Sequence, residues 1–214
     1  GSTSGVIQSV EWAVQDAATH NEPAVISMSL GGGQSPTMNR AIAAAHAAGV
    51  VCSVAAGNEN TDACTKSPAS ATEAITVGST TSSDRRSSFS NYGTCVDIFA
   101  PGSSVRGAGV SSDTAVLTLS GTSMACPHVS GSVAQIWSAR PGLTADEVIE
   151  ALLCQATPDA LSGIESDSPN QLLFGGATVV DGCAPAPPVS PPIPPAPPKP
   201  PPPPPSPRPS PPPP

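Results

Sequence analysis

The sequence predicts an α/β domain in which helices cover both faces of a parallel sheet. Short and almost continuous apolar runs alternate with segments whose apolar residues recur at helical spacing. Strands that are apolar throughout are typical of a parallel sheet buried on both faces, and the strand–helix–strand order agrees with this arrangement. Aromatic residues make up only 3% of the chain, so Ala, Val, Leu and Ile must fill the core.

The first predicted helix covers residues 5–19. It follows Ser4-Gly5, its apolar residues recur at the spacing of one helix face, and Pro23 ends it. The short apolar run over residues 24–28 comes next and predicts a buried strand.

The second predicted helix begins at Ser35-Pro36 and stops at Gly49, with proline at the first helical position and glycine past the end. Residues 50–55 form the next apolar strand. Further strands are expected at about 74–79 and 95–99.

The last elements surround a glycine turn. Residues 113–119 alternate polar and apolar side chains, which predicts a half-exposed strand leading into that turn. A long helix is expected over 122–139, with Pro127 near its beginning, where a missing N–H costs little. Thr144 and Glu147 have the spacing of a capping box and predict a final helix over 145–155.

Proline marks the boundary of the domain. The last 31 residues, Ala184 to Pro214, hold 21 of the 29 prolines of this 214-residue chain. Such a segment cannot build a core and favours extended polyproline II, at roughly 3.1 Å per residue. We therefore expect one domain over residues 1–183 and a proline-rich tail over 184–214 that acts as a spacer or adhesive segment.

Charge and hydropathy exclude two classes of partner. The net charge of −8, with scattered Lys and Arg, argues against nucleic acid binding. No run of 18 apolar residues is present, so no membrane span is expected. The first four residues, Gly1 to Ser4, do not resemble a signal peptide, and a targeting segment is expected to lie outside this sequence.

One octapeptide, Gly121 to His128 (GTSMACPH), places the hydroxyl of Ser123 between a glycine turn and the start of a helix. The free N–H groups and positive dipole end of such a helix would stabilise the oxyanion of an acyl transfer. The alternative is an ordinary helix cap, because Thr or Ser before an apolar helix is a common N-cap signal.

The octapeptide resembles the nucleophile motif of the subtilisin-like serine proteases (subtilases), in particular the proteinase K-like branch. Three other segments resemble subtilase segments in the same order: SMSLGGG (27–33), VAAGNEN (54–60) and SSFSNYG (87–93). The resemblance extends over residues 1–182. It implies a subtilisin-like fold and a serine endopeptidase with Ser123 as the nucleophile.

The resemblance also implies roles around Ser123. Asn58 would donate its side-chain amide to the oxyanion, although a turn asparagine is the plain alternative. Ser29, Leu30 and Gly31 would form the edge to which an extended substrate adds as a strand, although a simple strand-to-helix loop is also compatible with these residues. The other wall of the primary pocket would be Ala55, Ala56 and Gly57, whose small uncharged side chains suggest a broad, apolar-leaning cleavage preference.

A structural calcium site is the next implication of the resemblance. Asp97 matches a calcium carboxylate of the proteinase K-like branch, and backbone oxygens of Thr72 and Ala74 would complete the set. Carboxylate and carbonyl oxygens suit this hard cation. The alternative is that Asp97 is a solvated strand residue.

The six cysteines suit either an oxidising compartment or a set of buried thiols. The resemblance pairs Cys64 with Cys95, because proteinase K-like relatives carry a disulfide at matching positions. Cys154 with Cys183 is a second candidate pair. Cys126 is interpreted as a small buried thiol in the first turn after Ser123.

The catalytic base is not found in this sequence. Subtilases place their Asp and His before the Ser, in motifs of the Asp-(Ser/Thr)-Gly and His-Gly-Thr-His type, and neither motif occurs here. His128 would point about 140° away from Ser123 around the helix, and in the family it packs the helix. His46 and His20 are interpreted as structural. The first residues resemble the subtilase segment after the catalytic histidine, so an N-terminal part of the domain is expected to be missing.

Two functional hypotheses follow. The first is the C-terminal part of a secreted subtilisin-like endopeptidase that acts on proteins or peptides, inactive in this form because Asp and His lie on an absent segment. The second is a non-catalytic cell-wall or matrix protein, because the proline-rich tail resembles extensins, the hydroxyproline-rich wall glycoproteins. An intact set of Ser123, Asn58 and substrate edge favours the enzyme.

Overall fold

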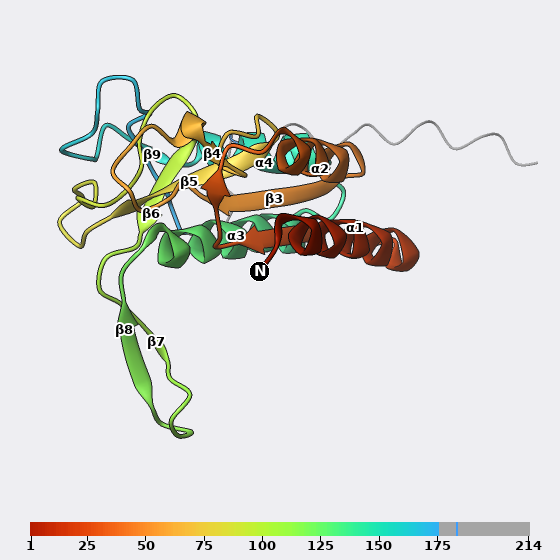
Figure 1. The fold of residues 1–214 in the computed structure, drawn as a ribbon, viewed down its shortest axis with the longest axis horizontal. Helices are drawn as coiled ribbons and strands as arrows, with labels where there is room; N and C mark the ends of the chain where they lie inside the picture. The colour runs from red at the N-terminus through yellow and green to blue at the C-terminus, as the bar shows by residue number, and fades with distance from the viewer. Residues whose placement is uncertain (176–182, 184–214) are drawn as a thin grey trace, which may run out of the picture.

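The computed structural model describes residues 1–175 and Cys183, so the proline-rich tail expected over 184–214 lies outside the described residues. A six-stranded sheet forms the centre, and helices lie on both of its sides (Figure 1). The predicted α/β architecture is therefore confirmed.

The elements have these bounds. The helices are α1 (Thr3–His20), α2 (Pro36–Ala47), α3 (Thr122–Ala139) and α4 (Ala145–Cys154), with a 3₁₀ turn η1 (Ala63–Thr65). The central strands, in sheet order, are β1 (Ala24–Met28), β3 (Val50–Ala55), β5 (Ala74–Thr80), β6 (Ile98–Pro101), β10 (Gln171–Leu172) and β9 (Thr157–Pro158). Two small antiparallel pairs are β2 (Gly32–Gly33) with β4 (Lys66–Ser67), and β7 (Val105–Ala108) with β8 (Val116–Leu119).

The first five strands in this order pair in parallel, and only β9 runs antiparallel to its neighbour β10. Alternate residues of β3 pack into two different hydrophobic cores, one on each face of the sheet. Val50, Cys52 and Val54 pack with residues of α1 and α2, whereas Val51 and Ala55 pack with residues of α3 and α4. A strand buried on both faces explains the continuous apolar run in the sequence.

Side-chain hydrogen bonds cap the first turns of α1, α2 and α4. Ser35 Oγ accepts from Met38 N ahead of Pro36, and Gly49 beyond the end of α2 has a φ of +85°. Helix α3 has the predicted bounds, and Thr144 and Glu147 form the predicted capping box of α4. Helix α1 begins two residues earlier than predicted, because Ser2 Oγ accepts a hydrogen bond from Gly5 N.

Two strands begin later in the structure than the sequence predicts. Strand β6 begins at Ile98 rather than residue 95, because Cys95 is tied to Cys64 and Val96 N donates to Gly93 O in a turn. Strand β8 begins at Val116 rather than residue 113, and its four residues are all exposed rather than alternately buried. It pairs only with β7, and Figure 1 shows this hairpin projecting away from the sheet.

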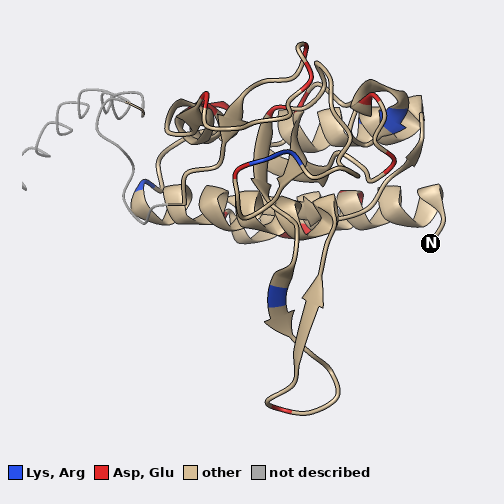
Figure 2. Ribbon diagram, turned by 90° about the vertical axis from the view of Figure 1, so that its left-hand side faces the viewer, with Lys and Arg blue, Asp and Glu red and all other residues tan. Residues whose placement is uncertain are grey.

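None of the described helices is long and apolar enough to span a bilayer. Figure 2 shows the Lys and Arg residues scattered over separate elements, as the sequence predicts.

Candidate active site

Ser123 lies in the first turn of α3, after a glycine that supplies no side chain to cap the helix. Its hydroxyl donates to the backbone oxygen of Ser29 at 3.4 Å, and Ser29 Oγ donates to the backbone oxygen of Ser123 at 2.8 Å. The reciprocal pair joins the loop after β1 to the start of α3. The Ser123 side chain is partly exposed and faces the cleft described below.

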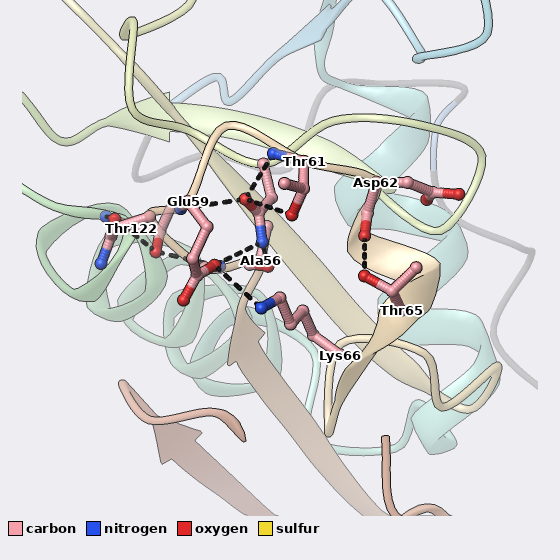
Figure 3. Close-up of polar contacts among 10 residues, drawn as sticks. Ala56, Glu59, Thr61, Asp62, Thr65, Lys66 and Thr122 are labelled. Atoms are coloured by element: carbon pink, nitrogen blue, oxygen red, sulfur yellow. Dashed lines mark hydrogen bonds and ion pairs between the residues drawn. The ribbon is translucent and has the colours of Figure 1, made fainter. Parts of the chain in front are cut away.

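Thr122 orients the side chain of Asn58. Asn58 Oδ1 accepts from Thr122 N at 2.8 Å and from Thr122 Oγ1 at 3.0 Å. With its oxygen held in this way, the amide nitrogen of Asn58 remains as a donor. Figure 3 shows Thr122 beside the turn that carries Glu59.

The backbone N–H of Ser123 and the side-chain amide of Asn58 both lie near Gly121. A Cβ placed on Gly121 would lie 3.6 Å from Ser123 N and 3.7 Å from both Nδ2 and Oδ1 of Asn58. Because Thr122 occupies Oδ1, the Asn58 amide offers its nitrogen as a donor, and Ser123 N lies in the first turn of α3, at the positive end of the helix dipole. This geometry can stabilise a developing negative charge on an oxygen bound there.

Gly57 makes the turn that brings Asn58 to this position. It adopts a φ of +106°, and a Cβ there would collide with the side-chain amide of the buried Asn91. Gly57 N donates to Thr122 Oγ1 at 3.2 Å, which ties the end of β3 to the start of α3. Only glycine combines this backbone conformation with the close approach of Asn91.

The predicted substrate-binding residues surround a cleft of about 180 Å³ next to Ser123 and Asn58. The structure thus brings together the residues that follow β1 and those that end β3. They are Ser29, Leu30, Gly31, Ala55, Ala56 and Gly57.

Two charged residues, Glu59 and Lys66, also line this cleft, and the sequence analysis did not assign them to it. Their atoms Oε2 and Nζ lie 3.8 Å apart (Figure 3). Lys66 reaches the cleft because β4 pairs with β2, which sets Lys66 opposite Gly33. Strands of two residues leave no periodic signal, although Glu59 directly follows Asn58 in the motif and could have been found there.

The polar contacts of the three histidines do not involve the Ser123 hydroxyl. His128 is exposed rather than packed, and its Nδ1 contacts the backbone oxygen of Met124 at 2.7 Å. His46 Nε2 lies 2.9 Å from Asp146 Oδ1, and His20 Nδ1 lies 2.9 Å from the backbone oxygen of Asp16. The hydrogen bond to Asp16 raises the pKa of His20.

Asp97 and Thr72 line a separate small cavity of about 130 Å³, whereas Ala74 is not part of its lining. Burial raises the pKa of Asp97 to about 6, although Thr76 N donates to its Oδ2 at 2.7 Å and opposes the shift. Within the described residues, no group of three or more His, Cys, Asp or Glu side chains could hold a metal ion. Any cation here would depend on one carboxylate and on neutral oxygens.

The structure contains both expected disulfides, Cys64–Cys95 and Cys154–Cys183. Cys126 is a buried thiol, as predicted, and its Sγ contacts the backbone oxygen of Ser53 at 3.3 Å. Cys52 is also buried and unpaired, and burial raises its pKa to about 12. A thiol with this pKa is inert at neutral pH.

Comparison with known proteins identifies relatives over the described part of the chain. Residues 1–175 match the model of the Subtilase family. An extracellular serine proteinase of Thermus sp. (strain Rt41A) is 52% identical over 174 residues, which cover 81% of this chain and 42% of the relative. A subtilisin-like serine protease of Rhodotorula mucilaginosa is 48% identical over 193 residues, covering 83% and 56%.

A solved structure, that of a cold-adapted subtilisin-like serine proteinase, matches with a TM-score of 0.78 and 47% sequence identity. The match covers 83% of this chain and 63% of that one. The chain spans about half the length of the two curated relatives above.

Proposed function

Because the chain belongs to the subtilase family, we propose that it is the nucleophile-bearing part of a serine endopeptidase. The observation that carries this proposal is that Ser123 and Asn58, whose amide oxygen Thr122 holds, line one cleft. Oxygen Oγ of Ser123 attacks the peptide carbonyl carbon, and the carbonyl oxygen takes up the negative charge between the two donors. Collapse of this intermediate releases the amine and leaves an acyl-enzyme, which water then hydrolyses.

The attack requires a base that takes the hydroxyl proton and returns it to the leaving amine. We infer that a histidine and an aspartate outside this sequence provide that base and orient it. The support is that the polar contacts of His20, His46 and His128 are with Asp16, Asp146 and the Met124 backbone, and none of them involves the Ser123 hydroxyl. On this proposal the chain by itself retains the oxyanion donors but turns over slowly.

Substrate binding follows from the walls of the cleft. An extended peptide would add to the edge formed by Ser29, Leu30 and Gly31, with its backbone close to the glycine. The side chain before the cleaved bond would enter the space between Leu30 and Ala56. The proposed partners are therefore proteins or peptides presented as an extended strand.

We propose a structural calcium ion at the cavity that Asp97 and Thr72 line. Among the described residues, the Asp97 carboxylate is in no ion pair, and burial raises its pKa to about 6. We infer that the carbonyl oxygen of Thr72, which lines the same cavity, supplies a neutral ligand, whereas Ala74 lies outside this lining and is not assigned to the site. The ion would neutralise the buried charge and strengthen the fold, and it would take no part in the chemistry.

An extracellular location agrees with the two disulfides and with the name of the Thermus relative. The alternative function, a non-catalytic wall or matrix protein, is favoured by the proline-rich composition of residues 184–214. It does not explain why the nucleophile, both oxyanion donors and the cleft are intact together.

Hydrolysis of a peptide by the protein expressed from its whole gene tests the proposal. Ser123→Ala should abolish turnover, whereas Ser138→Ala, an exposed position on the same helix, should leave it unchanged. Turnover that persists after Ser123→Ala, or a parent protein without peptidase activity, would overturn the proposal and favour the matrix role.

A further inference from the structure

Pro127 deprives the backbone oxygen of Ser123 of its regular helical hydrogen bond. In an α-helix, the oxygen of residue 123 accepts a hydrogen bond from the N–H of residue 127. Residue 127 is a proline inside α3, and proline has no backbone N–H. The first turn of α3 therefore presents a backbone acceptor, on the proposed nucleophile itself, that needs a donor from elsewhere.

The hydroxyl of Ser29 provides that donor. Ser29 Oγ donates to the backbone oxygen of Ser123 at 2.8 Å, which is the ordinary length of a hydroxyl–oxygen hydrogen bond. The return bond, from Ser123 Oγ to the backbone oxygen of Ser29, is longer, at 3.4 Å. One side chain from outside the helix thus replaces the N–H that Pro127 lacks.

The central sheet gives Ser29 a fixed position. Strand β1 pairs in parallel with β3 as far as Met28, which lies opposite Val54. Met28 is buried, and Ser29 is the next residue along the chain. A hydroxyl attached directly after a buried and paired residue has little freedom to follow a displacement of α3. The sheet is therefore the frame against which the carbonyl of Ser123 is held.

A second attachment holds the start of α3 from the other side. Thr122 N and Oγ1 donate to Asn58 Oδ1 at 2.8 and 3.0 Å, and Gly57 N donates to Thr122 Oγ1 at 3.2 Å. The residues after β3 thus bind Thr122, and the residue after β1 binds the carbonyl of Ser123. If the Ser29 bond is lost, the peptide group of Ser123 gains freedom to rotate relative to Asn58.

We propose that the hydroxyl of Ser29 positions the nucleophile: it binds the backbone oxygen that Pro127 leaves free and thereby fixes Ser123 relative to Asn58. This inference rests on the proposed endopeptidase function and deepens it, because it gives the Ser29 side chain a role apart from substrate binding. An added substrate strand pairs with the backbone of residues 29–31, which a change of this side chain leaves in place. The hydroxyl therefore acts on turnover rather than on substrate affinity.

The test uses the protein expressed from its whole gene and two readouts, peptide hydrolysis and the rate at which a fluorophosphonate labels Ser123. Ser29→Ala should lower kcat and the labelling rate by about three- to tenfold, the effect of one neutral hydrogen bond, with KM nearly unchanged. Ser29→Thr keeps a hydroxyl donor and should recover most of this loss. Ser9→Ala is the matched control: it removes a serine hydrogen bond of 2.9 Å to the backbone oxygen of Gly5 on α1 and should change neither readout.

A second background tests whether the hydroxyl acts through the backbone oxygen of Ser123. Pro127→Ala gives residue 127 an N–H, so the helix itself supplies the donor that proline lacks. In this background, Ser29→Ala should reduce the labelling rate by less than about twofold, within the low end of a hydrogen-bond effect. The melting temperature of each variant is measured alongside, so that labelling rates are compared on folded protein.

The outcomes distinguish this inference from the endopeptidase function. If the parent is active and Ser29→Ala has the same kcat and labelling rate, the role of the hydroxyl is overturned and the endopeptidase function stands. An equal loss in Ser29→Thr, or an equal loss with and without Pro127→Ala, also overturns it, because the effect then does not come from a donor to the Ser123 oxygen. A rise in KM at constant kcat overturns it as well and assigns the side chain to substrate binding. A parent that is inactive in both assays overturns the endopeptidase function, and this inference with it.

Discussion

The hydroxyl and backbone N–H of Thr122 decide the direction of the Asn58 amide. Both groups donate to Asn58 Oδ1, so the nitrogen is the atom left for a ligand beside Ser123. A carboxamide has one acceptor and one donor end, and binding the acceptor end by two donors leaves little freedom for rotation. The proposed donor is therefore oriented before any substrate arrives, which is the condition for efficient charge stabilisation.

Replacement of Asn58 should reduce turnover without weakening substrate binding. Asn58→Leu removes the donor and should lower kcat by about 10²- to 10³-fold, because an oxyanion donor acts on the transition state. KM should stay nearly unchanged in steady-state measurements on the protein from its whole gene. Asn58→Asp is the matched variant, since it keeps the acceptor for Thr122 but lacks the donor, and it should lose as much. A large rise in KM with constant kcat would instead assign Asn58 to ground-state binding.

Burial of Asp97 should make its contribution to the free energy of unfolding decrease as the pH rises. Its native pKa of about 6 exceeds its ordinary value of 3.8, so the native state binds the proton more tightly than the unfolded state. Its contribution to the free energy of unfolding is present below pH 4 and falls as pH rises through 6, by about 2–3 kcal/mol.

Denaturant unfolding at pH 4 and pH 7 in a chelator should show this fall in the parent relative to Asp97→Asn, which cannot titrate. Added calcium should cancel the fall in the parent and have no such effect on Asp97→Asn. Equal pH dependence in the two proteins would contradict the burial of an uncompensated charge at Asp97.

At the scale of elements, a disulfide fixes the loop that leads into β6. Cys64 follows β3 and Cys95 precedes β6, and their bond spans 31 residues that include β4 and β5. The pair also restrains η1, which positions Lys66 at the edge of the cleft. Covalent closure of a loop of this length reduces the entropy of the unfolded chain.

Replacing Cys64 and Cys95 together by Ser should therefore lower the free energy of unfolding by about 3–4 kcal/mol. Chemical denaturation monitored by circular dichroism measures this difference. Reduction of the parent by dithiothreitol is a control that breaks both disulfides. A double-serine variant as stable as the parent would show that the bond does not restrain this loop.

The helices whose bounds could be predicted contain the capping residues that determine those bounds. The ends of α2 and α4 could be predicted because Ser35-Pro36, Gly49 and the Thr144–Glu147 box act within one turn of the helix. The start of β6 depends on a disulfide partner 31 residues away, and the exposure of β8 depends on pairing with β7 alone. Such long-range constraints leave no periodic pattern.

The same distinction applies to the site. The motif segments contained Ser123, Asn58 and the small walls of the cleft, and the structure brings these residues together. Lys66 was missed because only the pairing of the short strands β2 and β4 carries it to the cleft. The roles of these residues remain predictions until turnover is measured.

At the scale of the whole molecule, the topology of the sheet assembles the site. Strands β1, β3, β5 and β6 are parallel, so their carboxyl ends meet at one edge. Ser29 follows β1, Asn58 follows β3, and helix α3 begins beside them at Thr122. Segments that are far apart in the sequence therefore bring together the proposed nucleophile, the proposed oxyanion donor and the proposed substrate edge.

Truncation after Cys183 should leave catalysis unchanged. Residues 184–214 are mostly proline and contribute no apolar periodicity with which to build a core. Ending the chain at Cys183 keeps the disulfide to Cys154. Both kcat/KM on a soluble peptide and the melting temperature should equal those of the parent, whereas a loss of either would assign the proline-rich segment to the catalytic domain.

The central claim, that Ser123 is an activated nucleophile, is tested most directly by mapping a fluorophosphonate adduct on the protein expressed from its whole gene. The adduct should be located by mass spectrometry of proteolytic fragments, with Ser123→Ala as the comparison. We predict a single modified site at Ser123 and none in the variant. An adduct on another residue, or no adduct in a preparation that hydrolyses peptides, would contradict the assignment.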